Sequence, residues 1–181
     1  MAEPFKLTRV ASLKTVTEFR AHLAKLDIDI PSDETLDSAV LAQPVGNVVI
    51  NQKKIGNRFA IHPMEGWDGT TTGAPTNEVK RRWRRFGESG AKLIYGGEAM
   101  AIRPDGRANP NQLIINETNL TDLTELRDTL AKAHRNRFGN TDDLVVGFQL
   151  THSGRFCRPN DNAIFEPRVA CRHPILDRKF K

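Results

Sequence analysis

The stretch NRFAIHPME, residues 57–65, decides the fold that this sequence predicts. Its centre, Arg58 to Ile61, is typical of a short buried strand. Pro63 ends that strand, because proline has no backbone N–H to donate within a sheet. Residues 66–75 then form a long polar loop that contains three glycines and Trp67. In α/β proteins the chemistry usually lies where a strand opens into such a loop.

Two later segments repeat this arrangement. Residues 92–95 predict a second short apolar strand, which the pair Gly96-Gly97 is expected to break, so that Ala99 lies in the loop that follows. Residues 144–150 are almost continuously apolar, which is typical of a strand covered on both faces. This third strand carries Gln149 near its far end. Each strand therefore delivers small or polar residues to its carboxyl end.

Two amphipathic helices are predicted between the three strands, over residues 77–88 and 120–136. Apolar residues recur along one face of each at spacings of three and four. They are Val79, Trp83 and Phe86 in the first helix, and Leu123, Leu126, Leu130 and Ala133 in the second. The residues expected to cap or end these helices are Thr76 for the first, and Asn119 or Thr121 with Gly139 for the second.

Residues 1–47 are expected to form an N-terminal extension that precedes the strands and helices. Apolar residues between Leu13 and Leu26 predict one amphipathic helix, with Ser12 as a candidate N-cap and Pro31 beyond its end. Residues 33–41 have mixed character and receive no assignment. Residues 48–55 predict a small hairpin with a polar turn. From Phe156 onward the sequence predicts a loop, with no third helix.

The order strand, helix, strand, helix, strand predicts a parallel α/β architecture with right-handed crossovers. A doubly wound dinucleotide fold is disfavoured, because no G-x-G-x-x-G follows the first strand. Functional-looking residues at all three strand ends favour a TIM (β/α)8 barrel, which needs eight such units. We therefore expect residues 48–181 to be the N-terminal three βα units of a larger, truncated barrel.

Composition restricts the function classes only broadly. The chain has 181 residues, 38% hydrophobic and 27% charged, which predicts one soluble globular domain. The net charge of +5 and pI of about 9.5 suit an anionic ligand but are weak evidence for nucleic acid. Cys157 and Cys171 predict no disulfide framework, and the histidines have no metal-ligand spacing. No signal peptide or membrane span is recognisable, so we expect a cytoplasmic protein.

Five sequence pieces follow one another along the chain: GNRFAIHPM at residues 56–64, Asp68-Gly69 with Pro75-Thr76, GGEA at 96–99, PDGR at 104–107, and QLTHSGR at 149–155. Together they resemble the old yellow enzyme family of FMN-dependent NAD(P)H oxidoreductases. No single piece is diagnostic, but the set covers residues 48–158. The resemblance implies a (β/α)8 barrel that transfers hydride from NAD(P)H through FMN to an electron-poor alkene or similar small molecule.

The resemblance also implies roles for individual residues. Pro63 and Met64 would form a wall of the flavin site, and Ala99 would leave room for the isoalloxazine ring. The amide of Gln149 would pair with the pyrimidine edge, since an amide both donates and accepts hydrogen bonds. Without the resemblance, the favoured interpretation of Gln149 is a side chain that caps buried backbone. Trp67 would line the substrate side, or simply pack within its loop.

One flavin-site position departs from the family. Glu65 follows the Pro-Met pair, where many relatives carry a threonine or cysteine that hydrogen-bonds the flavin. A carboxylate there would change the redox tuning. His152 and Arg155 are interpreted as residues that orient the loop after the third strand. The family's proton donor, substrate anchors and phosphate loops lie on later strands, so we expect no catalytic residue in this chain.

The alternative hypothesis is a non-catalytic half-barrel binding module. Its basic helix, Lys80 to Arg85, would meet an anionic partner, although a solvated helix surface is the simpler interpretation and nucleic acid is disfavoured. An open three-stranded sheet would also expose an unpaired edge, which favours aggregation or pairing with another fragment. A homo-oligomer of the full-length protein is compatible with either hypothesis.

Overall fold

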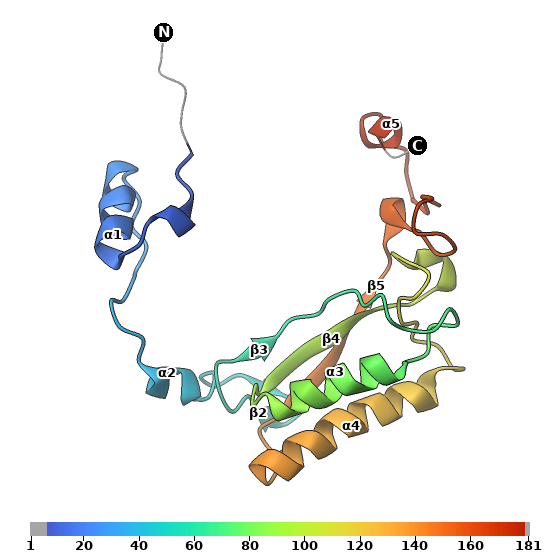
Figure 1. Ribbon diagram of the computed structural model, residues 1–181, viewed down its shortest axis with the longest axis horizontal. Coiled ribbons are helices and arrows are strands. Elements are labelled where there is room, and N and C mark those ends of the chain that lie inside the picture. Colours follow the sequence, from blue (N-terminus) through green and yellow to red (C-terminus); the bar gives the residue numbers. More distant parts are fainter. Residues whose placement is uncertain (1–6, 180–181) are drawn as a thin grey trace. The chain divides into compact units, whose positions relative to one another are not determined.

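The computed structural model describes residues 7–179 and divides the chain into two compact units, residues 1–38 and 39–181 (Figure 1). The boundary predicted after residue 47 remains a prediction. Among residues 7–179, no helix is both long and apolar enough to cross a membrane.

The first unit is built around one helix. A 3₁₀ turn, η1 (Val10–Ser12), precedes α1 (Val16–Lys25). The N-cap is Thr15, whose hydroxyl accepts a hydrogen bond from the Glu18 N–H at 3.1 Å, so the predicted Ser12 cap is wrong. Leu23 is the one residue of α1 that is buried. A short helix, α2 (Ser38–Ala42), begins at the last residue of this unit and belongs mostly to the second unit; it occupies part of the segment that the sequence left unassigned.

The predicted hairpin is confirmed. Strands β1 (Val49–Ile50) and β2 (Lys53–Lys54) pair antiparallel, so the lysines belong to a strand rather than to the turn. Asn51 and Gln52 form the turn and both have positive φ, as a two-residue hairpin turn requires. The Lys53 ammonium donates to the Thr141 carbonyl at 2.8 Å, which attaches the hairpin to the loop before the last strand.

A three-stranded parallel sheet forms the centre of the second unit, in the order β3 (Ala60–Ile61), β4 (Leu93–Ala101), β5 (Val145–Thr151). Each strand lies beside the next one in sequence, which confirms the predicted parallel α/β architecture. The sheet is open, with β3 and β5 at its edges, and does not close into a barrel.

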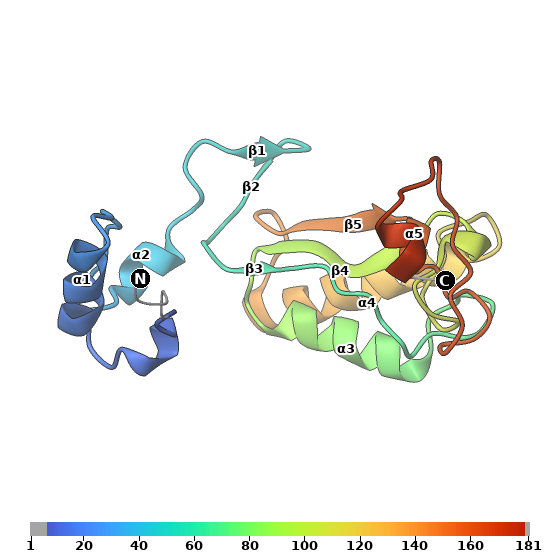
Figure 2. The ribbon, with the colours of Figure 1, turned by 90° about the horizontal axis from the view of Figure 1, so that it is seen from above.

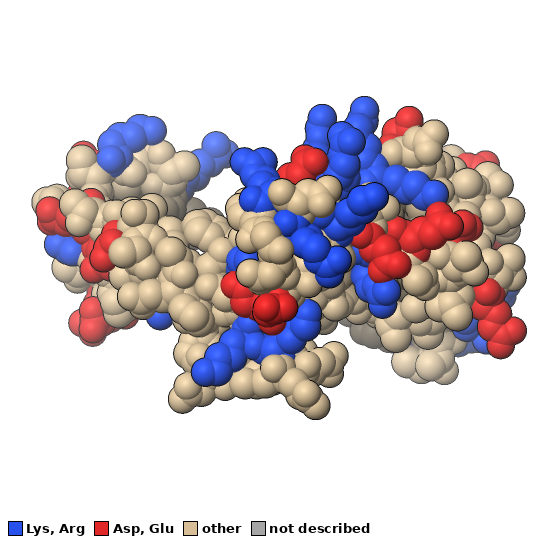
Figure 3. Space-filling model, turned by 90° about the horizontal axis from the view of Figure 1, so that it is seen from below, with Lys and Arg blue, Asp and Glu red and all other residues tan. Residues whose placement is uncertain are grey.

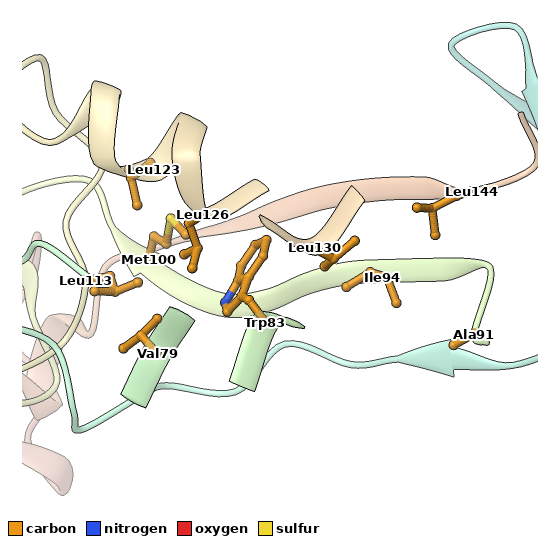
Figure 4. Close-up of a cluster of buried hydrophobic side chains, with 10 residues drawn as sticks. All are labelled: Val79, Trp83, Ala91, Ile94, Met100, Leu113, Leu123, Leu126, Leu130 and Leu144. Atoms are coloured by element: carbon orange, nitrogen blue, oxygen red, sulfur yellow. The ribbon is translucent and has the colours of Figure 1, made fainter. Parts of the chain in front are cut away.

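Helices α3 (Asn77–Glu88) and α4 (Leu120–Phe138) cover the same face of this sheet (Figure 2). The predicted caps are largely confirmed: the Thr76 hydroxyl accepts from the Val79 N–H, and Gly139 ends α4 with a φ of 89°. The core lies between helices and sheet, where side chains of α3, α4 and β4 point toward one another (Figure 4). Its members are Val79, Trp83, Ala91, Ile94, Met100, Leu113, Leu123, Leu126, Leu130 and Leu144.

Three strand predictions need correction. Strand β3 is only two residues long and is not buried, because it is an edge strand with one neighbour. Strand β4 runs through Gly96-Gly97 instead of breaking there, so Ala99 lies inside the strand. Strand β5 is mostly half-buried rather than covered on both faces, because α3 and α4 both lie on one side of the sheet.

The segments between β4 and α4 and after β5 are mostly irregular. Two 3₁₀ turns interrupt them, η2 (Pro104–Gly106) and η3 (Gly154–Phe156). A short helix, α5 (Leu176–Lys179), forms near the end, so the prediction of an entirely helix-free segment after Phe156 is wrong. This helix has a single turn and contributes no buried residue.

Candidate functional site

The carboxyl ends of the three strands bring four of the predicted site residues together. Ala99 of β4 lies opposite Gln149 of β5 in the parallel ladder. The Ala99 N–H also donates to the Met64 carbonyl at 3.0 Å, which joins the chain after β3 to β4. A Cβ atom built on Gly96 would lie 2.9 Å from Pro63 Cβ and 2.8 Å from the Gln149 nitrogen. Pro63, Met64, Ala99 and Gln149 therefore surround one point of the sheet.

Gly96 is what allows this close approach. Its φ of +71° lies in the left-handed region, which side chains rarely adopt, and no Cβ would fit between its neighbours. The pairing register shifts at this position, because Tyr95 faces Gly147 and the next pair is Ala99 with Gln149. Three residues of β4 thus oppose only Phe148 on β5. This bulge, rather than a strand break, is what the two glycines encode.

The Gln149 side chain is half-buried and makes no hydrogen bond with any residue in the range 7–179. Its amide therefore keeps a donor and an acceptor available at the strand end. A second glutamine, which the sequence did not single out, fixes Ala99 from the other side. The buried Gln112 amide donates to the Ala99 carbonyl at 2.7 Å and to the Thr151 hydroxyl at 3.2 Å. Only its place in a polar turn, residues 109–112, could have drawn attention to it.

The other two predicted residues, Glu65 and Trp67, line a cavity of about 460 Å³ together with Met64. Helix α3 contributes Arg82 and Phe86 to its wall. Both Met64 and Trp67 are exposed, at 75% and 57%. Gln149 does not line this cavity, so Met64 is the residue shared by the cavity and the Ala99–Gln149 pair.

An ion cluster at the wall of this cavity was missed by the sequence analysis. Arg82 donates to Asp68 Oδ1 at 3.0 Å and to Glu98 Oε1, from its Nε, at 3.1 Å. The cluster joins the loop after β3, helix α3 and strand β4. Arg82 therefore does not project into solvent with its basic neighbours on α3, as the sequence suggested. Its spacing from Val79 and Phe86, three and four residues, was the available signal, because it places Arg82 on the apolar face.

Burial and charge oppose each other within this cluster. Glu98 is 1% exposed, and burial raises the pKa of its carboxyl although Arg82 acts to lower it. Burial also lowers the pKa of Arg82, but hydrogen bonds with Asp68 and Glu98 outweigh it and hold that pKa above its usual value. The guanidinium is therefore permanently charged and fixed in position.

Three polar residues at the strand ends remain to be placed. His62 lines the same cavity as Trp67. His152 packs against Gly106, where a Cβ would overlap its ring, and Arg155 pairs with Asp177. Within residues 7–179, no three His, Cys, Asp or Glu side chains come together as a metal site would require.

No family model and no curated protein matches the chain, but solved structures do. A 2-naphthoyl-CoA reductase bound to 2-naphthoyl-CoA is 18% identical, with a TM-score of 0.54 over 71% of this chain and 18% of that chain. The old yellow enzyme from Trypanosoma cruzi is 19% identical, with a TM-score of 0.52 over 67% and 29% of the two chains. The old yellow enzyme homologue from Zymomonas mobilis is 18% identical, with a TM-score of 0.53 over 77% and 41%.

The likeness is one of fold. The chain spans less than half the length of each of these three proteins. Its strand–helix–strand–helix–strand unit is thus an arrangement that old yellow enzymes also contain.

Proposed function

We propose that this chain is part of an FMN-dependent oxidoreductase of old yellow enzyme type, and that it supplies one side of the flavin site. The observation that carries the proposal is the meeting of three strand ends at Ala99. There the Ala99 N–H bonds the Met64 carbonyl, and the Ala99 residue faces Gln149. These are the positions that the sequence resemblance assigned to flavin contact, and they belong to segments far apart in the chain.

The residues at this point fit a flavin. Gln149 offers an amide without a partner in the described chain, which matches a pyrimidine edge that both donates and accepts. Ala99 is small, and Pro63 with Met64 forms an apolar wall beside it. Bound FMN would supply hydride transfer from NAD(P)H to an electron-poor acceptor. The part of this chain is to bind and orient the ring.

Trp67 and Glu65 are assigned to the border of that site. Both line the cavity that begins at Met64, so a substrate lying over the ring would meet Trp67 from the side of the loop after β3. Glu65 would lie close enough to influence the electron affinity of the ring. The acceptor is a small molecule of unspecified identity.

The sheet supports a (β/α)8 barrel of which these are the first three units. Both of its edges are unpaired, and two helices cover one face only, as in one segment of a barrel wall. The proton donor and the substrate and phosphate anchors would come from further units, so this chain carries no catalytic residue of its own. A homo-oligomer of the whole protein is compatible with the proposal.

The proposal is tested by expressing the complete reading frame that contains residues 1–181 and recording its visible spectrum. We expect a yellow protein whose flavin absorbance is bleached by NADH or NADPH in the absence of oxygen. A colourless product that gains no flavin on incubation with FMN would contradict the proposal. The 181-residue chain alone should bind FMN only weakly, so sub-micromolar binding by its monomer would also count against it.

A variant pair locates the flavin contact. Gln149→Leu removes an amide that would bond the ring, and we expect FMN affinity to fall about tenfold, the equivalent of one or two hydrogen bonds. The matched control is Gln43→Leu, at an exposed position between α2 and β1, which should leave the affinity unchanged. Equal affinities for the two variants would show that Gln149 does not contact the flavin.

A further inference from the structure

A dense basic surface covers the C-terminal halves of α3 and α4. Leaving out Arg82, which is turned into the ion cluster, residues 81–88 and 130–138 carry six cations and one carboxylate, Glu88. The six are Arg81, Arg84 and Arg85 of α3, and Lys132, Arg135 and Arg137 of α4. We name this set the basic face. Figure 3 shows lysine and arginine side chains gathered on the helical side of the molecule.

The two helices contribute to one continuous feature. Arg84, Lys132 and Arg137 line an open groove of about 830 Å³ between α3 and α4. All six side chains of the basic face are exposed. Within the described part of the chain, the one ion pair among them joins Arg84 to Glu88 at 3.6 Å, with both groups in solvent. The groove itself is therefore lined by three cations and one carboxylate, a net charge of +2. Asp128, which lines a neighbouring hollow with Lys132 and Arg135, pairs with Arg127 at 2.6 Å.

The basic face is separate from the candidate flavin site. Helices in parallel α/β units run back from the carboxyl ends of the strands to their amino ends, so the C-termini of α3 and α4 lie at the amino ends. The residues around Ala99 and Gln149 lie at the carboxyl ends. The six cations therefore have no part in holding a flavin.

We propose that the basic face binds the phosphate backbone of a nucleic acid without reading its sequence. Five of the six cations are arginines, whose planar guanidinium matches phosphate oxygens in a bidentate geometry. Repeated cations along a groove fit a repeated anion better than a single one. A membrane surface fits less well, because interfacial helices bury an apolar face. The apolar faces of α3 and α4 are already in the core, and on these halves the exposed large apolar residue is Phe138.

An acidic protein partner also fits less well. Protein interfaces usually have a central apolar or aromatic patch surrounded by charge, and the groove between the helices is lined by charged and small polar side chains with one alanine. The chemistry of the surface is thus almost purely ionic.

The test measures binding of the 181-residue chain to fluorescein-labelled duplex DNA and single-stranded RNA by fluorescence anisotropy, from about 50 to 200 mM salt. The test variant carries Arg84→Gln, Lys132→Gln and Arg137→Gln. The control carries Arg103→Gln, Arg172→Gln and Arg178→Gln, which removes the same charge from exposed positions in the segments that follow β4 and β5. We expect the wild-type affinity to fall steeply with salt, and the test variant to lose at least about tenfold in affinity at 100 mM salt.

The salt slope gives the decisive comparison. Each lost phosphate contact lowers the slope of log K against log salt by about one, so the test variant should lose about three and the control none. Equal losses in both variants would overturn the proposal, since net charge alone would then explain binding. Three further outcomes would overturn it as well. The wild-type chain could fail to bind nucleic acid, polyglutamate could compete as well as DNA does, or the chain could bind phosphatidylserine vesicles in preference to DNA. Thermal melting verifies that both variants are folded.

Discussion

At the scale of the residue, Arg82 and Glu98 form the pair whose disruption should cost most. Glu98 is almost fully buried, and within the described chain its cation is Arg82. Removing one partner of a buried pair leaves an uncompensated charge. Arg82 is itself one-third exposed, so the loss should be smaller than for a fully buried pair. We expect Arg82→Gln to reduce the free energy of unfolding by about 2 kcal/mol. Urea denaturation at neutral pH measures this loss.

The adjacent residue provides a matched control. Arg81 is exposed and is not part of the cluster, so Arg81→Gln should change the stability by less than about 0.5 kcal/mol. Equal effects at positions 81 and 82 would mean that the cluster contributes nothing beyond general charge.

Glu98 also predicts a pH dependence. Burial raises the pKa of its carboxyl above the ordinary value of 4.5, so the folded chain binds more protons than the unfolded chain between 4.5 and the raised pKa. Stability must therefore fall as pH rises through this window, and the cost is absent below it. The measurement is the free energy of unfolding of the wild-type protein and of Glu98→Gln over a range of pH. The wild-type value minus the variant value should decline from about pH 4.5 upward. A difference that rises with pH would show that Arg82 outweighs burial.

Single residues were predictable where the signal is local. Thr76 and Gly139 were identified because a cap depends on chemistry within one helical turn. Arg82 with Glu98, and Gln112 with Ala99, are partners 16 and 13 positions apart. Such pairs depend on how strands and helices meet, which local patterns do not contain.

At the scale of the element, the contact between α3 and α4 depends on Gly87. A Cβ there would overlap the backbone oxygen of Leu130 and lie 3.1 Å from Ala133 Cβ. Alanine favours a helix over glycine by about 1 kcal/mol, but forcing packed helices apart costs about 1 to 3 kcal/mol. We expect Gly87→Ala to lower the stability by about 1 kcal/mol, measured as a shift of the urea midpoint.

Gly147 is the control for this substitution. Its added Cβ would meet only Tyr95 Cδ2, at an ordinary 3.8 Å, and its φ is not positive. Gly147→Ala should therefore be neutral or stabilise the protein by a few tenths of a kcal/mol. Stabilisation by both substitutions would contradict close packing between α3 and α4.

Element types were predicted better than element limits. Both long helices were identified, because their apolar periodicity extends over three or more turns. Strand β3 was overestimated, since Phe59 and Ile61 predict burial that an edge position does not provide. Strand β4 was underestimated, because glycine pairs occur both in loops and in bulges, and only the neighbouring Pro63 and Gln149 determine which one forms.

At the scale of the whole molecule, the uncovered sheet face predicts self-association. Tyr95 on that face is 48% exposed, and Leu150, on the opposite face of the edge strand β5, is 61% exposed. Apolar residues beside an unpaired strand edge favour pairing with another chain. We expect light scattering of the 181-residue chain to rise with concentration in the micromolar range, and the single substitutions Tyr95→Lys and Leu150→Lys each to suppress it.

Leu36 is a suitable control for this experiment. It is 79% exposed and lies in the first compact unit, so Leu36→Lys adds a charge without altering the sheet. If Leu36→Lys suppressed self-association as strongly as the sheet variants do, added charge in general would explain the suppression. A chain that stays monomeric at high micromolar concentration would show that the open face is harmless.

The bulge in β4 has a consequence for the lengths that this strand can have. From Tyr95 to Ala99 the chain advances four residues while β5 advances two, so the segment holds two extra residues, an even number. Deletion of both would keep Ala99 and Met100 on their present faces. Deletion of one would exchange the faces of every later residue in the strand, placing Ala99 in the core and Met100 outside it. Insertions and deletions here are therefore tolerable only in pairs, a parity rule that homologous sequences of this strand should obey.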